Sequence, residues 1–348
     1  MESFIFALNA TLPVVLMVAI GYILKRIGIM TVDFAKMANK LVFRLFLPVM
    51  LFMNVYGIEN LGEINLGSVL YAAAAVLLTF AVGIPIVILI TKRQNRRGAL
   101  LQSFFRSNNA LIGVALAELL AGTAGIVATS MMAAFIIPIF NILSVVSLSI
   151  FKSEDTPELD GTAENGEIAA KEPPRVSFYV KRITLGIVKN PLLWAIGAGF
   201  VALGIRAILT SMSIDFRISD IPLVWKTMSY LSGLATPLAL IALGGQFEFS
   251  AIVELKKEIT AGTLARTVIV PLLALGIAVI AFRDSFSGAE FAAMIAMFCT
   301  PVAVSSVPMA QEMGADTDLA SQLVVFTTLV SALTIFVASF ALKAIGIL

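Results

Sequence analysis

The chain alternates between long apolar stretches and short polar connections. A helix needs about 20 apolar residues to cross the hydrocarbon core of a bilayer, and stretches of that length recur along the whole sequence. In the first half they fall at roughly 4–24, 36–56, 68–91, 98–121 and 124–151. In the second half they fall at roughly 190–210, 223–247, 259–282, 289–313 and 318–345. The pattern predicts an all-α polytopic membrane protein with about ten transmembrane helices.

Composition agrees with this interpretation and excludes several other classes of protein. Hydrophobic residues make up 59% of the 348 residues and charged residues 13%, against about 45–50% and about 25% in soluble domains. The chain has no histidine, which removes imidazole metal ligands and imidazole acid–base chemistry. We expect no enzymatic activity, no metal and no cofactor. A net charge of +2 does not favour binding to nucleic acid.

Basic residues are concentrated in alternate connections between the apolar stretches. The third connection holds Lys92, Arg93, Arg96 and Arg97, whereas the eighth holds only Arg283. Because Lys and Arg accumulate in cytoplasmic loops, this asymmetry indicates the orientation of the helices. It predicts a multi-pass protein of the cytoplasmic membrane with both termini outside.

One long polar segment, 152–182, divides the chain into two halves. It is rich in acidic residues and proline and poor in large apolar residues, so it cannot bury enough surface to order itself. We interpret it as a flexible cytoplasmic linker, and a regulatory or partner-binding segment is the alternative. The expected organisation is a five-helix repeat over 1–151, the linker over 152–182, and a second, inverted five-helix repeat over 183–348.

The two halves are weakly similar to each other. Pro13 is followed eight residues later by Gly21, and Pro191 is followed eight residues later by Gly199. Because each half has five spans, equivalent helices would cross the membrane in opposite directions. Inverted repeats of this kind are typical of secondary transporters, in which interrupted helices at matching positions indicate the substrate site.

The fourth and ninth spans are interrupted at matching positions. Asparagine side chains compete for backbone hydrogen bonds, and proline removes a helical hydrogen bond. Half-helix N-termini at such breaks direct partial positive charge toward an anion. We therefore predict that helices 4 and 9 break and cross, with helix breaks at Gly113, Pro301 and Pro308. The candidate substrate-binding residues are Arg106, Ser107, Asn108, Asn109, Thr300, Ser305 and Ser306; mutual satisfaction of these side chains within the bundle is the alternative.

Three further charged residues within the spans are candidates for a proton site or a charge pair: Glu118, Arg44 and Arg266. Charged residues inside a membrane are functional candidates by default. Arginines near a helix end can also extend to the interface, so snorkelling or a structural pair is the favoured interpretation for Arg44 and Arg266. Glu118 is the best candidate for a protonatable group.

Several short motifs, in this order along the chain, resemble the auxin efflux carrier family, which includes bacterial permeases for malate and malonate. They are Asn39-Lys40-Leu41-Val42-Phe43 with Leu47-Pro48, Asn108-Asn109 with Ile112-Gly113, Asn190-Pro191, Thr236-Pro237-Leu238-Ala239-Leu240 with Gly244-Gly245, Pro301-Val302-Ala303, Ala320-Ser321 and Thr327-Thr328. The resemblance covers the chain apart from 152–182. The sequence departs from the family at Ala115, where a proline is usual, and at Arg44, where an uncharged residue is expected.

The resemblance implies a fold similar to sodium/proton antiporters and bile-acid transporters. A scaffold domain would carry spans 1, 2, 6 and 7, and a transport domain would carry spans 3–5 and 8–10. The expected function is secondary transport of small organic anions, carboxylates, across the cytoplasmic membrane by an elevator-like movement. Alternatives are a sodium-coupled symporter of the bile-acid type and a membrane-embedded receptor or scaffold. The sequence does not identify the transported anion. A coupling ion (H⁺ or Na⁺) and a homodimer are both compatible with it.

Overall fold

The computed structural model describes residues 2–58, 65–152 and 188–348. Its first half contains α1 (Glu2–Arg26), α2 (Val32–Leu41), the π-helical turn η1 (Val42–Phe46), α3 (Leu47–Tyr56), α4 (Leu66–Ile90), α5 (Gln94–Phe105), the π-helical turn η2 (Asn109–Gly113) and α6 (Val114–Ile150). Its second half contains α8 (Pro191–Ser211), η3 (Ile218–Asp220), α9 (Pro222–Gln246), α10 (Ser250–Glu254), α11 (Lys256–Leu264), the π-helical turn η4 (Ala265–Ile269), α12 (Val270–Phe282), α13 (Gly288–Phe298), α14 (Ser306–Glu312) and α15 (Thr317–Ala344). The predicted all-α fold is confirmed over these residues. The predicted linker lies, from residue 153 on, outside them.

Seven helical segments of the described chain are long and apolar enough to cross a membrane. They are Val32–Tyr56, Leu66–Ile90, Val114–Ile150, Pro191–Ser211, Pro222–Gln246, Lys256–Phe282 and Thr317–Ala344. The outward faces of these segments carry large apolar side chains, and Leu89 and Ile280 are more than four-fifths exposed. Such surfaces suit a lipid solvent, and the protein is a multi-pass membrane protein.

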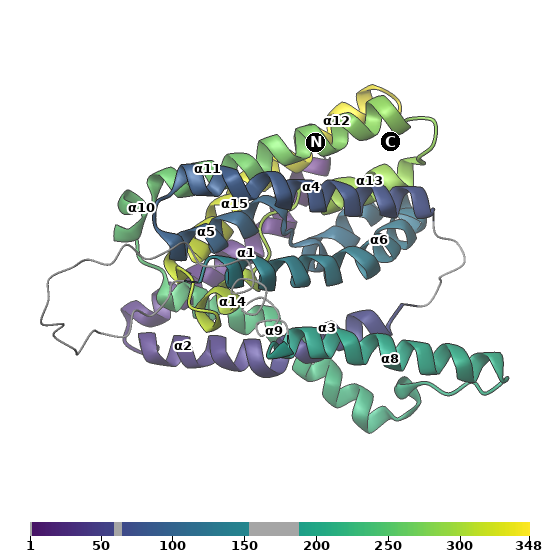
Figure 1. Cartoon of the computed structure of the whole chain (residues 1–348), viewed down its shortest axis with the longest axis horizontal. Helices are drawn as coiled ribbons and strands as arrows, with labels where there is room; N and C mark the ends of the chain where they lie inside the picture. The colour runs from purple at the N-terminus through teal and green to yellow at the C-terminus, as the bar shows by residue number, and fades with distance from the viewer. Residues whose placement is uncertain (1, 59–64, 153–187) are drawn as a thin grey trace, which may run out of the picture.

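The helices form two groups, which Figure 1 shows as a larger upper body and a smaller lower one. In the smaller group α3 packs against α8 and α9, and α2 packs against α9. In the larger group α6 packs against α13, α4 packs against α5 and α6, and α15 packs against α5, α11 and α14. Helix α1 contacts both groups, through α9 and α15.

Helix α1 reaches α9 closely because two glycines face each other there. A Cβ on Gly21 would lie 2.1 Å from the carbonyl oxygen of Ile241, and a Cβ on Gly244 would lie 2.0 Å from that of Val18. No side chain fits at either position. Small residues allow this backbone approach between membrane helices, where dispersion contacts stabilise association.

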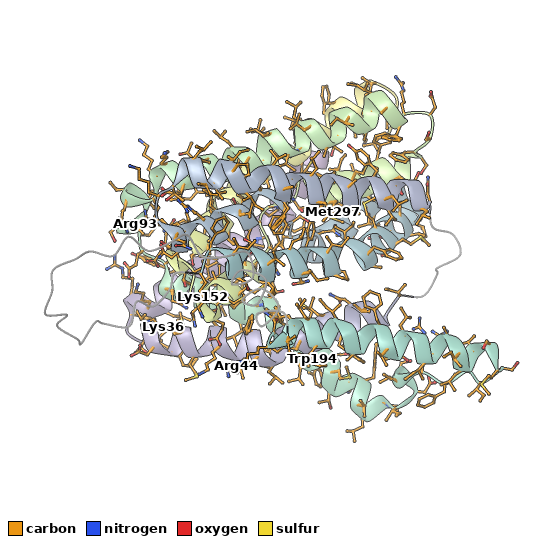
Figure 2. The ribbon with its side chains drawn as sticks, viewed as in Figure 1. Lys36, Arg44, Arg93, Lys152, Trp194 and Met297 are labelled. Carbon is orange, nitrogen blue, oxygen red and sulfur yellow. The ribbon has the colours of Figure 1, made fainter. Side chains whose placement is uncertain are left out.

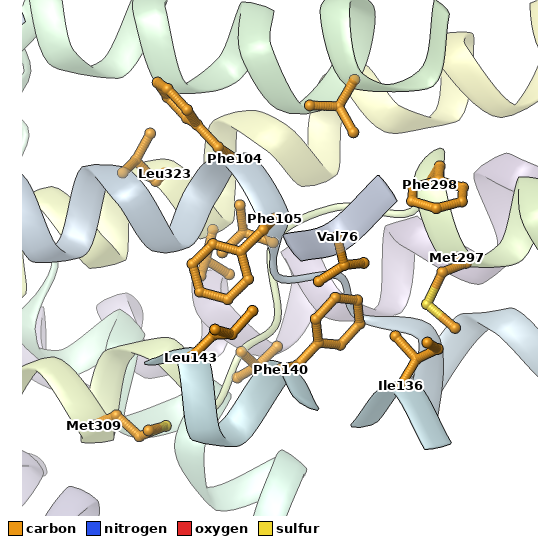
Figure 3. Close-up of a cluster of buried hydrophobic side chains, with 14 of the residues drawn as sticks. Val76, Phe104, Phe105, Ile136, Phe140, Leu143, Met297, Phe298, Met309 and Leu323 are labelled. Carbon is orange, nitrogen blue, oxygen red and sulfur yellow. The ribbon is translucent and has the colours of Figure 1, made fainter. Parts of the chain in front are cut away.

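Aromatic and aliphatic side chains fill the interior of the larger group, around the end of α5 (Figure 3). The ring of Phe105 contacts that of Phe80 on α4, with centroids 5.4 Å apart, and that of Phe140 on α6, with centroids 6.4 Å apart. All three side chains are buried. This packing fixes the residue directly before the point at which the helix breaks.

Candidate functional site

Two helices of the larger group break and cross at the same place. After α5 ends at Phe105, Ser107 pairs antiparallel with Val302, which follows the end of α13. The backbone N–H of Asn108 donates to the carbonyl oxygen of Pro301 at 2.8 Å. The two irregular segments therefore satisfy part of each other's backbone. Irregular backbone at membrane depth requires such burial in protein.

The residue types around the crossing explain where the helices break. Pro301 has no N–H and lies in the irregular segment, whereas Pro308 lies in the first turn of α14, where proline is tolerated. Gly113 ends the π-helical turn η2, and a Cβ there would lie 1.8 Å from Oδ1 of Asn109. Of the three predicted break residues, Pro301 lies in the crossing, and Gly113 leaves the space that the Asn109 side chain occupies.

Arg106 lies at the crossing and is bound only by neutral groups among the described residues. Its Nη2 donates to Oδ1 of Asn141 at 3.0 Å and to Oγ of Ser305 at 2.8 Å, and its Nη1 lies 2.6 Å from Sδ of Met309. The residue is 3% exposed. A buried charge is costly unless it is paired, and no described carboxylate forms an ion pair with this one.

Arg266 approaches the same crossing from η4 and binds backbone atoms. Its Nε donates to the carbonyl oxygen of Thr300 and its Nη2 to that of Met297, both at 2.8 Å. These carbonyls lie at and just beyond the C-terminal end of α13, where a helix leaves acceptors unsatisfied and favours a cation. Arg266, fully buried, therefore stabilises the end of a half-helix, as a structural partner would.

A cavity of about 400 Å³, here called the Arg106 cavity, opens beside the crossing. Polar groups reach it from the crossing and from α3, α6 and α9. They are Arg106, Ser107, Asn108, Ser305, Asn54, Asn141, Ser232 and Thr236. The remaining walls are mostly apolar, with Met50, Leu51, Ile137 and Phe140 among them. A concave, mostly apolar site with a few convergent polar groups is typical of small-molecule binding.

A second cavity of about 460 Å³, here called the Asn109 cavity, lies beside the first. Its polar lining comes from Asn54, Asn109 and Ser130. Leu51, Asn54 and Ile137 line both cavities, so these side chains form the partition between them. The Nδ2 and Oδ1 of Asn109 are buried without a hydrogen-bond partner, as is the Nδ2 of Asn108. Both carboxamides therefore keep hydrogen-bonding capacity for a ligand.

The remaining predicted site residues take varied positions. Ser107 Oγ contacts Sδ of Met297 at 3.7 Å, and Thr300 Oγ1 donates to the carbonyl oxygen of Ala296, four residues earlier in α13. Ser306 Oγ is buried without a partner. The structure thus brings Arg106, Ser107, Asn108 and Ser305 to one cavity and Asn109 to the other, while Thr300 and Ser306 are not among the described lining residues of either.

The other two charged candidates lie away from the crossing. Arg44, in η1, forms an ion pair with Glu312 at the end of α14, with 3.2 Å between Nε and Oε2. Figure 2 shows Arg44 at the edge of the molecule, and its side chain is 63% exposed. Glu118 is exposed on α6. Neither residue lines the two cavities beside the crossing.

Four polar residues of the Arg106 cavity, Asn54, Asn141, Ser232 and Thr236, were not predicted as binding residues. Asn54 is the only carboxamide of α3, and Asn141 is the only carboxamide of α6. Since polar groups at that depth are costly, a single asparagine in a membrane helix is a usable signal. The sequence pattern does not predict which of these side chains reach the same cavity, because that depends on how α3, α6 and α9 pack.

Comparison with known proteins agrees with a membrane carrier. Residues 6–339 match a family model described as membrane transport protein. An uncharacterized transporter of Methanothermobacter thermautotrophicus is 24% identical over 336 residues, which cover 94% of this chain and 96% of the relative. The similarity therefore extends over both halves and the crossing.

Proposed function

The chain belongs to the membrane transport protein family, the auxin efflux carrier family, and from this premise we propose that it is a secondary carrier of small organic anions. The proposed substrates are carboxylates, and the proposed location is the cytoplasmic membrane. Transport as such follows from the family. The anionic substrate is argued from the site.

The observation that carries the proposal is the state of Arg106. Its guanidinium is buried, lines the cavity, and is held only by the carboxamide of Asn141, the hydroxyl of Ser305 and the thioether of Met309. Guanidinium and carboxylate form strong, geometrically specific hydrogen bonds. A bound carboxylate would supply the negative charge that this site lacks.

The walls of the Arg106 cavity support a small substrate with an apolar part. Apart from its polar groups, the cavity is lined by apolar side chains that include Met50, Leu51, Ile137 and Phe140. At about 400 Å³ it has the size typical of small-molecule sites. A carboxylate bound at Arg106 would direct its carbon skeleton against these side chains.

We further propose that the chain has ten membrane spans in two inverted halves, 1–151 and 183–348. The support is that each half contributes one broken helix, α5 with α6 and α13 with α14, and that the breaks pair antiparallel at Ser107 and Val302. Antiparallel pairing of equivalent segments is what two halves of opposite orientation require. With both termini outside, α3 would run outward from Leu47.

This orientation assigns a side of the membrane to each cavity. The Arg106 cavity reaches Leu47, at the start of α3, and would face the cytoplasm, whereas the Asn109 cavity reaches Gly57, beyond its end. We propose that the larger helix group shifts along the smaller one in an elevator-like movement. The substrate would then pass the partition formed by Leu51, Asn54 and Ile137.

The test is a thermal-unfolding screen of the purified protein against monocarboxylates, dicarboxylates and indole acids. A ligand that binds only the folded state raises the melting temperature. We expect at least one carboxylate to stabilise the protein and to be moved by it in proteoliposomes. Purified protein that binds and moves no carboxylate would contradict the proposal and favour a receptor or scaffold.

A further inference from the structure

A third cavity, of about 420 Å³, lies where the first turns of α4 and α13 meet α6 just beyond the Ala121–Gly122 kink. Its polar lining consists of Asn65, Ser68, Thr123, Ser287 and Glu290. Arg106 and Asn109 do not line it. This region, here called the Glu290 cavity, shares Val127 and Met131 with the Asn109 cavity and no described lining residue with the Arg106 cavity.

Glu290 has one oxygen that the protein leaves unused. Its Oε2 accepts from the backbone N–H of Ser287 at 2.7 Å and lies 3.0 Å from the Ser287 hydroxyl. Its Oε1 is buried and has no hydrogen-bond partner, and the residue is 8% exposed. No described basic group forms an ion pair with this carboxylate. The capping of α13 accounts for one oxygen of Glu290, and the other oxygen has no partner, in a residue that lines the cavity.

The donor set indicates the class of ligand. Apart from the carboxylate, the polar groups of the lining are neutral: the hydroxyls of Ser68, Thr123 and Ser287, and the carboxamide of Asn65, whose Oδ1 also accepts from the backbone N–H of Gly67. Hard cations prefer oxygen ligands, and divalent calcium is usually held by several carboxylates. The Glu290 carboxylate is the only charged group of this lining, so a cation with a single positive charge neutralises it.

We propose that the Glu290 cavity binds an inorganic monovalent metal cation that is coupled to the anion at Arg106. This inference rests on the proposed function. Helix α13 joins the two sites, because Glu290 lies in its first turn and the crossing follows its last residue. With both ligands bound, neither the carboxylate nor the guanidinium is left without a counter-charge. The cost of carrying buried charges across a low-dielectric region then falls.

The experiment measures thermal unfolding of the purified full-length protein at constant ionic strength. Chloride salts of Li⁺, Na⁺ and K⁺ are compared with choline chloride. We expect at least one metal cation to raise the melting temperature with its concentration, as a ligand of the folded state does. In Glu290→Gln we expect the apparent Kd for that cation to rise about tenfold or more, since one charge–charge interaction is lost.

Three variants make the result specific. Glutamine at the third position of a helix still completes a capping box, so Glu290→Gln keeps the cap of α13. Glu118→Gln removes the same charge from an exposed position and is expected to keep the wild-type cation response. Ser68→Ala is expected to weaken the response as well, and it provides a second reading if Glu290→Gln does not fold.

Three outcomes would overturn the cation site: no metal cation stabilises the wild type beyond choline, Glu290→Gln retains the full response, or Glu118→Gln loses it. Carboxylate stabilisation measured both in choline chloride and in the chloride salts of the metal cations tests Arg106 separately. Failure in every salt would reject the proposed function, whereas failure of the cation response alone would leave the anion site in place.

Discussion

Two buried arginines reach the crossing, Arg106 from the end of α5 and Arg266 from η4, and their partners differ in kind. Arg266 binds two main-chain carbonyl oxygens at the end of α13, those of Thr300 and Met297. Arg106 binds a carboxamide, a hydroxyl and a thioether, and it lines a cavity. The main-chain carbonyl groups at the end of α13 cannot move away from Arg266 unless that end of the helix unfolds. The side chains around a cavity can rotate, so a ligand can replace one of their hydrogen bonds to Arg106. Burial alone therefore does not distinguish a structural charge from a binding charge.

The largest effect is expected from removing Arg266. Arg266→Gln leaves buried carbonyl oxygens without their charged donor, and each lost charge-assisted hydrogen bond is worth about 1.5–3 kcal/mol. Two such bonds correspond to about 3–6 kcal/mol, and removal of the buried charge offsets part of this loss. We expect a net loss in the free energy of unfolding, seen as a strongly lowered melting temperature and poor yield. An unchanged melting temperature would mean that Arg266 is not needed to hold the end of α13.

The opposite behaviour is expected from Arg106→Gln. Removing a buried charge that no described carboxylate offsets also removes its desolvation cost, so the melting temperature is expected to stay near that of the wild type. Carboxylate transport in proteoliposomes is expected to fall about a hundredfold, since truncating one side of a buried charged pair costs about 2–5 kcal/mol. Full transport by this variant would remove Arg106 from the binding site.

Arg106→Lys sharpens the same comparison. Lysine keeps the charge but offers no planar fork for bidentate binding. We expect transport between that of the wild type and that of Arg106→Gln, with a higher KM. Equal transport by Arg106→Lys and the wild type would indicate that only the charge matters.

A smaller effect is expected from a residue that holds Arg106 in place. Ser305 Oγ accepts one of its hydrogen bonds at 2.8 Å. Ser305→Ala is expected to weaken carboxylate affinity about three- to tenfold, the value of one hydrogen bond of about 1 kcal/mol, in a titration followed by thermal unfolding. The matched variant Ser306→Ala removes a hydroxyl that has no partner and is expected to leave affinity unchanged.

The smallest effect is expected at the exposed ion pair of Arg44 and Glu312. Its Nε and Oε2 are 3.2 Å apart, but the Arg44 side chain is 63% exposed, and such pairs contribute about 0–1 kcal/mol. Arg44→Gln is therefore expected to shift the melting temperature by a few degrees at most. A shift comparable to that of Arg266→Gln would mean that exposure is a poor guide to the roles of these arginines.

The sequence predicted the class of fold and the place of the crossing, because both depend on local chemistry. Apolar stretches predict membrane helices, and Asn108 and Pro301 weaken helical hydrogen bonding where the structure shows irregular backbone. The π-helical turns that carry Arg44 and Arg266 have no comparable signal. They depend on how each helix packs against its neighbours.

The hydrogen-bond partners of each polar side chain were harder to predict than its position within a membrane helix. Thr300 was expected to bind substrate, but its hydroxyl bonds the carbonyl oxygen of Ala296 one turn earlier. Asn54 and Asn141 line the Arg106 cavity, although neither lies next to a predicted helix break. Whether a polar side chain already has a hydrogen-bond partner depends on tertiary contacts. These contacts cannot be inferred from a single sequence.

The most direct test of the binding role of Arg106 compares a carboxylate with its neutral amide. Thermal unfolding of the wild type and Arg106→Gln would be followed with increasing concentrations of the stabilising carboxylate from the screen and of the amide with the same skeleton. We predict that only the carboxylate raises the melting temperature of the wild type and that neither compound raises that of Arg106→Gln. Equal stabilisation of the wild type by the amide, or full stabilisation of Arg106→Gln by the carboxylate, would contradict the anion site.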